Sequence, residues 1–356
     1  MNGSLVSPLQ GSSPPVSVII LNHNGKQVID RCLSSVLTSN YPSFEIIVVD
    51  NGSTDGSVEI VKDRFRNSKN VRLIESDQNL GASAGRNEAA KIANGRYLAF
   101  LDADTLVDEN WLREAVLLME QHRSVAIVQC KLLLLTETRK IDYVGDFMSQ
   151  FGFLVQRVPL GTLDCDLWQR TALIFGVKSA GMVARKCVFE EIGKFDEDYF
   201  IYMEETDLCW RAWLNGSEVA YSPTSIVYHD FGQLSKLQSQ RTKFLSKYHG
   251  TKNYVTTILK NADGLTLVKI VPIHLALWMG IIVWHFGRGR TREGFWISRG
   301  ILYNLRNLRS TWSKRIVIQN QIRMVSDKTI LSKVMKRISP SYLYWKATHE
   351  GSGWNL

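Results

Sequence analysis

The sequence predicts an α/β protein in which a mixed, mainly parallel sheet is flanked by helices and is followed by a basic helical C-terminal region. The first observation is that short β-rich runs alternate with helical stretches from Val16 to Gln129. Such alternation implies right-handed crossovers between parallel strands. The second observation is the uneven charge. Residues 241–356 carry 20 lysines and arginines against 4 acids, although the net charge of the whole chain is only +9.

The alternation can be followed element by element. The expected strands are Val16–Leu21, Phe44–Val49, Val71–Glu75, Tyr97–Leu101 and Val125–Gln129. The expected helices are Gln27–Thr38, Ser57–Phe65, Ser83–Ala93 and Asp108–Gln121. The last of these helices has acids in its first turn, as the helix dipole favours.

After Lys131 the regular pattern stops. Residues 131–178 are expected to form an irregular, substrate-facing insertion. The elements expected beyond it are a strand at Ala180–Arg185, a short helix at Val188–Gly193, a helix at Glu204–Leu214 and a last strand at Ser225–His229. Acids at the start of Glu204–Leu214 and Asn-Gly after it mark the two ends of that helix.

Two aspartates, Asp102 and Asp104, directly follow the apolar run Tyr97–Leu101. In a buried parallel sheet, ligands collect just beyond the carboxyl ends of the strands. Two carboxylates held close together there are costly unless a cation neutralises them. Hard oxygen ligands suit Mg²⁺ or Mn²⁺ together with substrate phosphates. The pair therefore predicts a site for a divalent metal ion and a diphosphate, although solvated loops also produce this pattern by chance.

Further polar residues follow the neighbouring strands. Asn22 ends the first strand, and Asp50 and Asn51 end the second. Asp50 could accept a hydrogen bond from a base N–H or a ribose hydroxyl, whereas the glycines around it also fit ordinary turns. Arg86 lies near the start of the third helix. A guanidinium beside a helix N-terminus forms an anion site, and the alternative is a plain surface arginine.

A third group of candidates lies downstream. Glu204, Glu205 and Asp207 occupy the first turn of the expected helix Glu204–Leu214. A partly desolvated carboxylate on a helix end can take the proton of a hydroxyl nucleophile, whereas solvated acids there would only compensate the dipole. His229 ends the last strand. It is either a structural histidine or a residue that completes a metal shell through a ring nitrogen.

Together these residues resemble the family-2 glycosyltransferases with a GT-A fold, over roughly residues 16–235. The matching stretches, in order, are VSVIILNHNG, EIIVVDNGSTDGS, NLGASAGRNEA, YLAFLDADT, SAGMVARKCVFEEIGKFDEDYFIYMEETDLCWRAWLNG and VYH. The resemblance implies that a nucleotide-diphosphate sugar donates its sugar to an acceptor hydroxyl with inversion and without an enzyme nucleophile. Within the family, the chain is most similar to rhamnosyltransferase-like members that extend surface polysaccharides.

The resemblance also implies roles for single residues. Asp50 and Asn51 would hold the base and ribose of the donor. Asp102 and Asp104 would bind the divalent ion on its diphosphate, and His229 would join the metal shell. The metal ion and the guanidinium of the third helix would stabilise the leaving nucleoside diphosphate.

The family's catalytic base comes from an acidic pair before a D-L-x-x-R motif. The second member of that pair is usually aspartate, whereas this chain has Glu205. This difference leaves the choice among Glu205, Glu204 and Asp207 open, with Glu205 favoured.

The expected division of the chain follows from these patterns. The parts are a disordered segment at 1–15 without a signal peptide, a GT-A domain at 16–235 with a nucleotide-binding half at 16–130 and an acceptor-binding half at 131–235, and a basic helical region at 236–356. The five cysteines form no C-x-x-C pair. They are therefore expected to be reduced thiols in a cytosolic compartment.

The basic region is expected to bind an anionic membrane surface on its cytoplasmic face. Ile270–Phe286 has no residue of fixed charge over 17 positions, which is the lower limit for a spanning helix. Arginines follow it closely, so a single span would violate the positive-inside tendency. We therefore expect a re-entrant or interfacial helix near 265–286, with a buried core helix as the alternative. Phe295–Leu308 and Ile316–Met335 add basic amphipathic character, and a lipid-linked glycan acceptor would explain the arrangement.

Other classes of protein fit less well. A dehydrogenase would need G-x-G-x-x-G after the first strand, where this chain has Asn-His-Asn-Gly. A sugar-nucleotide pyrophosphorylase would begin with a glycine-rich loop ending in a basic residue. No nucleic-acid-binding motif is visible, and the oligomeric state stays unknown. The remaining alternative is a catalytically inactive scaffold that binds a sugar nucleotide or a membrane.

Overall fold

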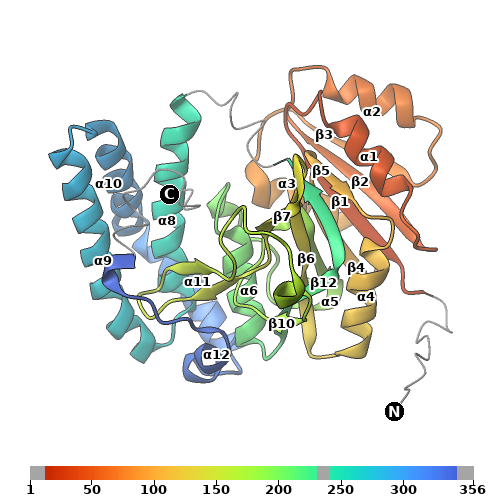
Figure 1. Ribbon diagram of the computed structural model, residues 1–356. Helices are drawn as coiled ribbons and strands as arrows, with labels where there is room; N and C mark the ends of the chain where they lie inside the picture. The colour runs from red at the N-terminus through yellow and green to blue at the C-terminus, as the bar shows by residue number, and fades with distance from the viewer. Residues whose placement is uncertain (1–12, 231–239, 343–356) are drawn as a thin grey trace, which may run out of the picture.

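A mixed sheet forms the centre of the molecule (Figure 1). The computed structural model describes residues 13–230 and 240–342. Within them the sheet has ten strands, with the order β10-β12-β6-β11-β4-β1-β2-β3, while β5 pairs with β12 and β7 pairs with β6. The strands are β1 (Val16–Asn22), β2 (Phe44–Asn51), β3 (Val71–Ser76), β4 (Tyr97–Asp102), β5 (Thr105–Val107), β6 (Val125–Leu134), β7 (Glu137–Tyr143), β10 (Ala172–Leu173), β11 (Met182–Arg185) and β12 (Glu218–His229). The predicted mixed, mainly parallel α/β fold is confirmed.

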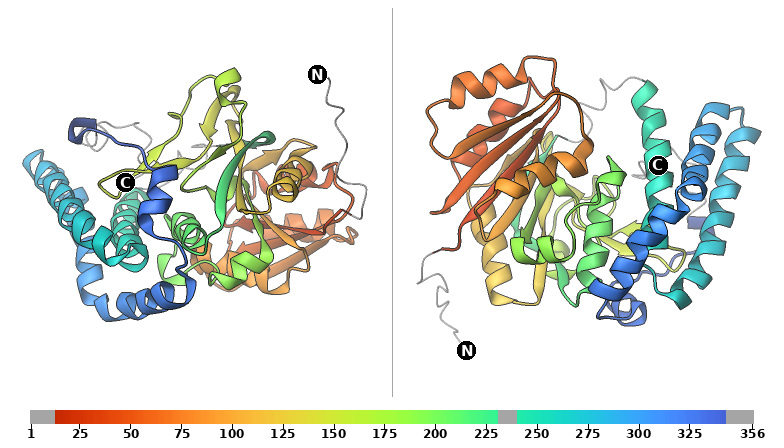
Figure 2. Two further views of the ribbon diagram at one scale, coloured as in Figure 1. Left: turned by 90° about the horizontal axis from the view of Figure 1, so that it is seen from below. Right: turned by 180° about the vertical axis from the view of Figure 1, so that it is seen from behind.

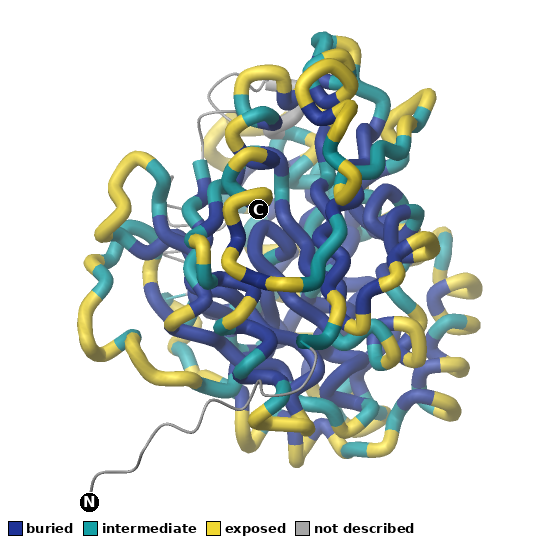
Figure 3. Tube along the Cα trace, turned by 90° about the vertical axis from the view of Figure 1, so that its right-hand side faces the viewer, coloured by how far each residue is buried: buried dark blue, intermediate teal, exposed yellow. Residues whose placement is uncertain are grey.

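Helices cover both faces of this sheet. They are α1 (Ile29–Leu37), α2 (Ser57–Phe65), α3 (Gly81–Ile92), α4 (Trp111–Gln121), α5 (Lys186–Glu191) and α6 (Glu204–Leu214). Successive residues of a strand point to opposite faces. Accordingly Val18 and Ile20 of β1 pack with α1, α2 and α4, whereas Ile19 packs with α3, α5 and α6. Figure 3 shows the buried centre that results, with the exposed residues around it.

The insertion after Lys131 is more regular than expected. β6 continues to Leu134 instead of stopping near Gln129. The polar side chains within it can be buried because they have hydrogen-bond partners inside the protein. Lys131 binds Asp164 and Gln169, and Gln129 donates to the carbonyls of Cys130 and Gly181. The insertion then forms β7, the hairpin β8 (Asp146–Met148) and β9 (Leu154–Gln156), a 3₁₀ turn (Asp166–Trp168) and β10. The expectation of an irregular segment at 131–178 was therefore wrong for residues 131–156, whereas residues 157–178 contain only the 3₁₀ turn and the two-residue β10.

The last strand of the sheet is also longer than expected. Ser225–His229 is only the second half of β12, which begins at Glu218. The register of β12 against β6 shifts between Ser222 and Ile226, next to Pro223. Proline cannot donate a ladder hydrogen bond and is found in sheets at such irregularities. This break hides the continuity of the strand in the sequence.

The C-terminal region consists of helices that stand beside the domain, on the side remote from α1 and α2 (Figures 1 and 2). They are α8 (Gln240–Asn261), α9 (Gly264–Gly287), α10 (Thr291–Arg306), α11 (Leu308–Val317), a π-helical turn (Ile318–Ile322) and α12 (Asp327–Val334). The expected segment Phe295–Leu308 falls largely on α10. Ile316–Met335 is not one amphipathic helix, because the backbone is extended at Arg323 and Ser326 caps a new helix.

Both expected domain boundaries fall near residues outside the description. Of the segment expected to be disordered at 1–15, residues 1–12 lie outside the described residues. The carbonyls of Pro14 and Pro15 accept hydrogen bonds from Tyr41 and Arg96, so the structured part begins before Val16. The boundary expected at 235/236 falls within 231–239, which also lies outside the described residues.

Two mid-helix glycines give a matched test of how closely α8 and α10 pack. A Cβ on Gly300 of α10 would lie 2.8 Å from the Tyr248 carbonyl oxygen and 2.9 Å from Thr251 Cβ, both on α8, whereas one on Gly280 of α9 would meet nothing within 4 Å. Gly300→Ala should therefore lower the free energy of unfolding by about 1–3 kcal/mol. Gly280→Ala should raise it by up to about 1 kcal/mol through helix propensity. Chemical denaturation measures both, and equal stabilisation by the two variants would contradict the packing.

Candidate functional site

The carboxyl ends of the central strands bring the predicted site residues together. In the parallel register of β1 with β2 and β4, Asn22 lies opposite Asp50, and Leu21 lies opposite Asp102. His229 at the end of β12 lies opposite Thr105 of β5, one residue beyond Asp104. Strand register alone therefore places acids and an imidazole at one edge of the sheet.

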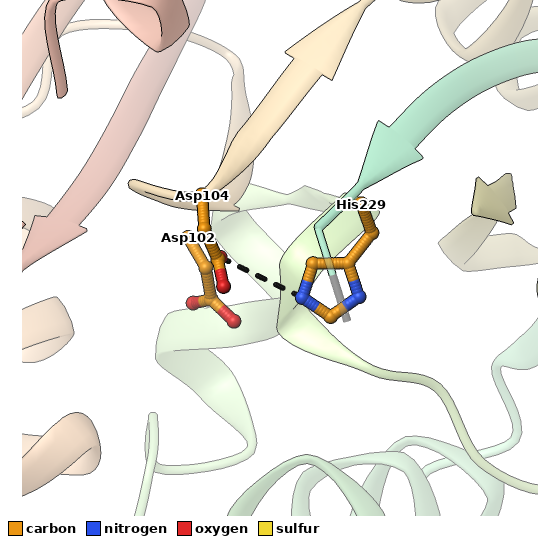
Figure 4. A group of neighbouring side chains, drawn as sticks. All are labelled: Asp102, Asp104 and His229. Carbon is orange, nitrogen blue, oxygen red and sulfur yellow. Dashed lines mark ion pairs between the residues drawn. The ribbon is translucent and has the colours of Figure 1, made fainter. Parts of the chain in front are cut away.

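Three side chains form a compact cluster there: Asp102, Asp104 and His229 (Figure 4). One ligand atom from each lies within 4.8 Å of the others, and His229 Nε2 is 3.6 Å from Asp104 Oδ1. Burial acts to lower the pKa of His229, but Asp104 and Asp142 outweigh it and raise that pKa to about 10. The cluster thus favours positive charge. Two carboxylates and one imidazole nitrogen are a donor set that fits Mn²⁺ or Mg²⁺.

Arg86 is buried and joins two of the predicted acids. Its Nη2 donates to Asp102 Oδ1 at 2.7 Å, and its Nη1 donates to Glu204 Oε1 at 3.1 Å. The alternative of a surface arginine on the third helix was wrong. The guanidinium therefore lies at the cluster, where it offsets negative charge on Asp102 and binds the carboxyl group of Glu204.

The three candidate acids of α6 have different surroundings. Asp207 is fully buried and accepts hydrogen bonds from Arg211, Asn261 and Tyr199. It is therefore committed to a network inside the protein. Glu205 accepts two hydrogen bonds at one oxygen, from the Ser179 N–H at 3.0 Å and the Ser179 hydroxyl at 2.6 Å.

Glu204 has a raised pKa. Burial, with the charge of Glu205 beside it, raises its pKa to about 8 despite the opposing effect of Arg86. Its second oxygen, Oε2, has no hydrogen-bond partner among the described residues. A carboxyl in this state retains its proton near neutral pH and is a poor general base.

The residues predicted to hold the donor base lie together but bind one another. Asp50 accepts from Asn22 Nδ2 at 2.8 Å and from the Ser53 N–H at 2.9 Å. Asn51 bridges to the loop before α3, since its amide donates to the Gly81 carbonyl and its oxygen accepts from the Leu80 N–H. All three side chains are buried. They fix the shape of the loops at the edge of the sheet.

A cavity of about 520 Å³ opens beside these groups, within the range typical of ligand pockets. Its polar wall includes Arg86, Asp102, Asp104, His229, Glu204 and Glu205. Its apolar lining includes the side chains of Leu154, Leu160, Val177, Ile201, Met203 and Tyr254. Asp207 does not line the cavity as the described residues define it.

The loop before α6 has an unusual backbone and is held by α8. Phe200, Tyr202 and Met203 have positive φ of 61°, 69° and 69°. The side-chain amide of Asn253 on α8 donates to the carbonyls of Tyr199, Ile201 and Tyr202 at 2.7–3.0 Å. The C-terminal region thus fixes the segment that presents Glu204 and Glu205 to the cavity.

Two buried partners of the site escaped sequence reasoning. Asp142 on β7 accepts from His229 Nδ1 at 2.7 Å, and Ser179 binds Glu205. Asp142 fell in the segment expected to be irregular, and Ser179 precedes a strand whose antiparallel direction was not predicted. An acid between Ile141 and Tyr143 in an otherwise apolar stretch is the one signal that pointed to a buried role.

Comparison with known proteins defines the class that this fold and site represent. Residues 17–151 match Glycosyl transferase family 2, and residues 97–308 match Glycosyl transferase family group 2. The second match covers more than half of the chain. The chain therefore belongs to the glycosyl transferase family group 2, and its fold is GT-A.

Individual relatives agree with this assignment. An uncharacterized glycosyltransferase of Haemophilus influenzae is 30% identical over 235 residues, which cover 63% of this chain and 71% of the relative. The O-antigen biosynthesis protein RfbC of Myxococcus xanthus is 30% identical over 233 residues, or 63% of this chain and 18% of RfbC. For the first curated relatives, the matched part spans only between 18% and 35% of their length.

Solved structures share the fold at low sequence identity. A crystal structure of GalNAc-T7 with UDP, GalNAc and Mn²⁺ has a TM-score of 0.57 and 19% identity, and the match covers 70% of this chain and 48% of that one. The mannosyltransferase PcManGT from Pyrobaculum calidifontis, in complex with GDP-Man and Mn²⁺, has a TM-score of 0.52 and 16% identity, with 86% and 85% covered.

The raised pKa of Glu204 predicts a pH dependence of stability. The unfolded chain ionises this glutamate near the ordinary value of 4.5, whereas the folded protein retains the proton up to about pH 8. Between these values the unfolded state binds fewer protons, so stability falls as the pH rises, by at most about 1.4 kcal/mol per pH unit from this group. Glu204→Gln should remove this slope in denaturation experiments from pH 5 to 9. The exposed Glu190→Gln should keep it, and equal slopes in both variants would show that Glu204 is ionised in the fold.

Proposed function

We propose that the protein is an inverting glycosyltransferase that transfers a sugar from a nucleoside-diphosphate sugar to a hydroxyl of a glycan or lipid-linked glycan acceptor. One observation carries this proposal. The Asp102–Asp104–His229 cluster and the acids of α6 line the same cavity, so a metal-bound diphosphate and a proton acceptor would face one substrate. GT-A membership and the polysaccharide-related names of several relatives support the reaction class.

The proposed reaction is a single displacement. A divalent ion, when bound, would neutralise the donor diphosphate and stabilise the nucleoside diphosphate as it leaves. Asp102, Asp104 and His229 would hold that ion, and Arg86 would add positive charge beside Asp102. The acceptor oxygen bonds to the anomeric carbon as the bond from that carbon to the diphosphate breaks. The proton of the acceptor hydroxyl passes to a carboxylate of the protein.

Glu205 is the residue that we propose as this base. Asp207 is bound on several sides by cations and amides, and Glu204 retains its own proton near neutral pH. The two hydrogen bonds from Ser179 hold one oxygen of Glu205 in place. They leave its other oxygen as the proposed acceptor of the proton.

We propose that the loops after β1 and β2 bind the nucleotide of the donor. Asp50, Asn51 and Asn22 would recognise the base and ribose, and residues 16–130 would form the nucleotide-binding half. Residues 131–235 would form the acceptor-binding half. A rhamnosyl donor stays a prediction from the resemblance to rhamnosyltransferase-like members.

We also propose that the region 236–356 attaches the protein to an anionic membrane, on its cytoplasmic face. Within the described chain, α9 is the one helix that is long and apolar enough to cross a membrane by length and composition. An exposed apolar stripe runs along it, formed by Leu265, Val268, Pro272, Ile273, Ala276, Met279, Val283 and Phe286. Exposed arginines follow the end of the helix at residues 288, 290 and 292. This combination fits an apolar surface bordered by anionic head groups.

The packing of α9 favours an interfacial position over a span. His274, near the middle of the helix, contacts the Phe151 carbonyl at 3.0 Å, and Ile270 and Trp278 are buried against the domain. A helix fixed to the domain along its centre cannot enter the bilayer core alone. The apolar lining of the cavity, which includes Tyr254 of α8, would accept the apolar part of a lipid-linked acceptor.

A transfer assay tests the function. The full chain would be incubated with Mn²⁺, a panel of uridine, guanosine and thymidine diphosphate sugars that includes a rhamnosyl donor, and lipid-linked glycan acceptors. Glu205→Gln should lower kcat by about 10²- to 10⁴-fold. Asp104→Ala and removal of the metal by EDTA should abolish transfer, and Mn²⁺ should restore it in the EDTA-treated wild type.

The exposed Glu190→Gln serves as the charge-matched control and should leave kcat unchanged. Full turnover by Glu205→Gln would exclude this residue as the base. Donor binding without transfer by the wild type, for every donor and acceptor, would favour the inactive-scaffold alternative.

A vesicle-binding experiment tests the membrane proposal. Deletion of 241–356 should release the protein, but it would also remove the Asn253 contacts to the loop before α6. Substitutions on the stripe are cleaner. Val268→Glu with Val283→Glu, at positions 72% and 66% exposed, should reduce sedimentation with phosphatidylglycerol vesicles, because charge on this face opposes burial in lipid. Leu167→Glu, at a position 74% exposed in the insertion, should not. Unchanged sedimentation of the double variant would rule out the stripe as the membrane surface.

A further inference from the structure

We propose that Asp142 is a positioning residue that fixes the ring of His229 so that Nε2 faces the metal site. This inference rests on the proposed metal-dependent function. Asp142 itself would not touch the ion or the substrate. It would act through the imidazole, in the way that an outer carboxylate sets the tautomer and orientation of a metal-bound histidine.

The backbone at Asp142 is built to turn this side chain inward. β7 runs antiparallel to β6, with Leu132 opposite Tyr143 and Leu133 opposite Ile141. Asp142 is thus an extra residue between two paired positions, which is a β-bulge. Bulges bend a strand and re-aim a side chain, and they are frequent next to active sites. In a regular ladder without the bulge, Asp142 would lie opposite Leu133.

The contacts of His229 are asymmetric. Its Nδ1 is 2.7 Å from Asp142 Oδ2, and its Nε2 is 3.6 Å from Asp104 Oδ1. Nδ1 therefore faces Asp142, and Nε2 faces the aspartates of the cluster, where a bound divalent ion would take the place of a proton on Nε2.

The burial of Asp142 calls for a reason. The side chain is fully buried, and its other oxygen lies 3.7 Å from Lys178 Nζ. A buried carboxylate costs free energy unless it is paired. A plain structural ion pair would satisfy that requirement, but it would not need His229 to be oriented with one nitrogen facing Asp104. The proposed metal role explains this orientation of His229, whereas an ion pair alone does not.

Manganese binding tests the inference independently of sugar transfer. Mn²⁺ would be titrated into the purified full chain with UDP present, and free Mn²⁺ would be followed by electron paramagnetic resonance. Asp142→Asn keeps the volume of the side chain but removes its charge, and it should weaken Mn²⁺ binding by about 10- to 100-fold. Asp142→Glu should recover part of the loss. Asp146→Asn changes a nearby buried aspartate that pairs with Tyr143, and it should leave the affinity unchanged.

The variants distinguish a failure of the proposed metal site from a failure of the positioning role of Asp142. If Asp104→Asn binds Mn²⁺ like the wild type, the metal site of the proposed function is wrong. If Asp104→Asn loses Mn²⁺ and Asp142→Asn keeps it, only the positioning role is overturned. Should Asp142→Asn fail to fold, ¹⁵N spectra of the wild-type imidazole with Mg²⁺ decide: a protonated Nδ1 and an unprotonated Nε2 support the inference, and the reverse tautomer overturns it.

Discussion

The Arg86 guanidinium lies between two carboxylates that come from distant parts of the chain, Asp102 at the end of β4 and Glu204 at the start of α6. The end of β4 and the start of α6, which both line the cavity, meet at this cation. Arg86 and Glu204 are buried, whereas the Asp102 side chain is 35% exposed. Loss of the contacts to Arg86 would leave a buried cation without a partner, which costs about 3–5 kcal/mol. This guanidinium thus joins Asp102 of the acidic cluster to the first residue of α6.

A second set of buried polar contacts joins the C-terminal helices to the elements that line the cavity. Lys260 and Asn261 of α8 bind Asp196 and Asp207, and Asn253 binds the carbonyls of the intervening loop. The inner face of α8 is therefore polar, while the outer face of α9 is apolar. The same region that is proposed to contact lipid thus also fixes the loop that precedes Glu204 and Glu205. A membrane anchor joined through a flexible linker would have no such contacts.

The sequence predicted those parts of the site that depend on local rules. Asp102 and Asn22 could be placed because a strand end is visible as the point where an apolar run meets polar residues. His229 could be placed for the same reason. Ser179 and Asp142 could not, because their positions depend on an antiparallel strand inserted next to β4 and on a bulge opposite β6. Neither the antiparallel strand nor the bulge produces a periodic pattern in the sequence. The choice between Asp207 and Glu205 as the proposed base also required the structure. Only the positions of Arg211 and α8 show that the charge of Asp207 is already compensated.

The residues with positive φ before α6 have a thermodynamic consequence. Phe200, Tyr202 and Met203 adopt a backbone conformation that costs about 1–3 kcal/mol for each non-glycine residue. The hydrogen bonds from Asn253 help to offset this cost, and they come from a helix that begins about 40 residues later in the chain. The local stability of the loop is thus linked to the docking of α8. Amide hydrogen exchange in residues 199–203 therefore reports whether α8 is docked, even though the residues that exchange lie outside the C-terminal helices.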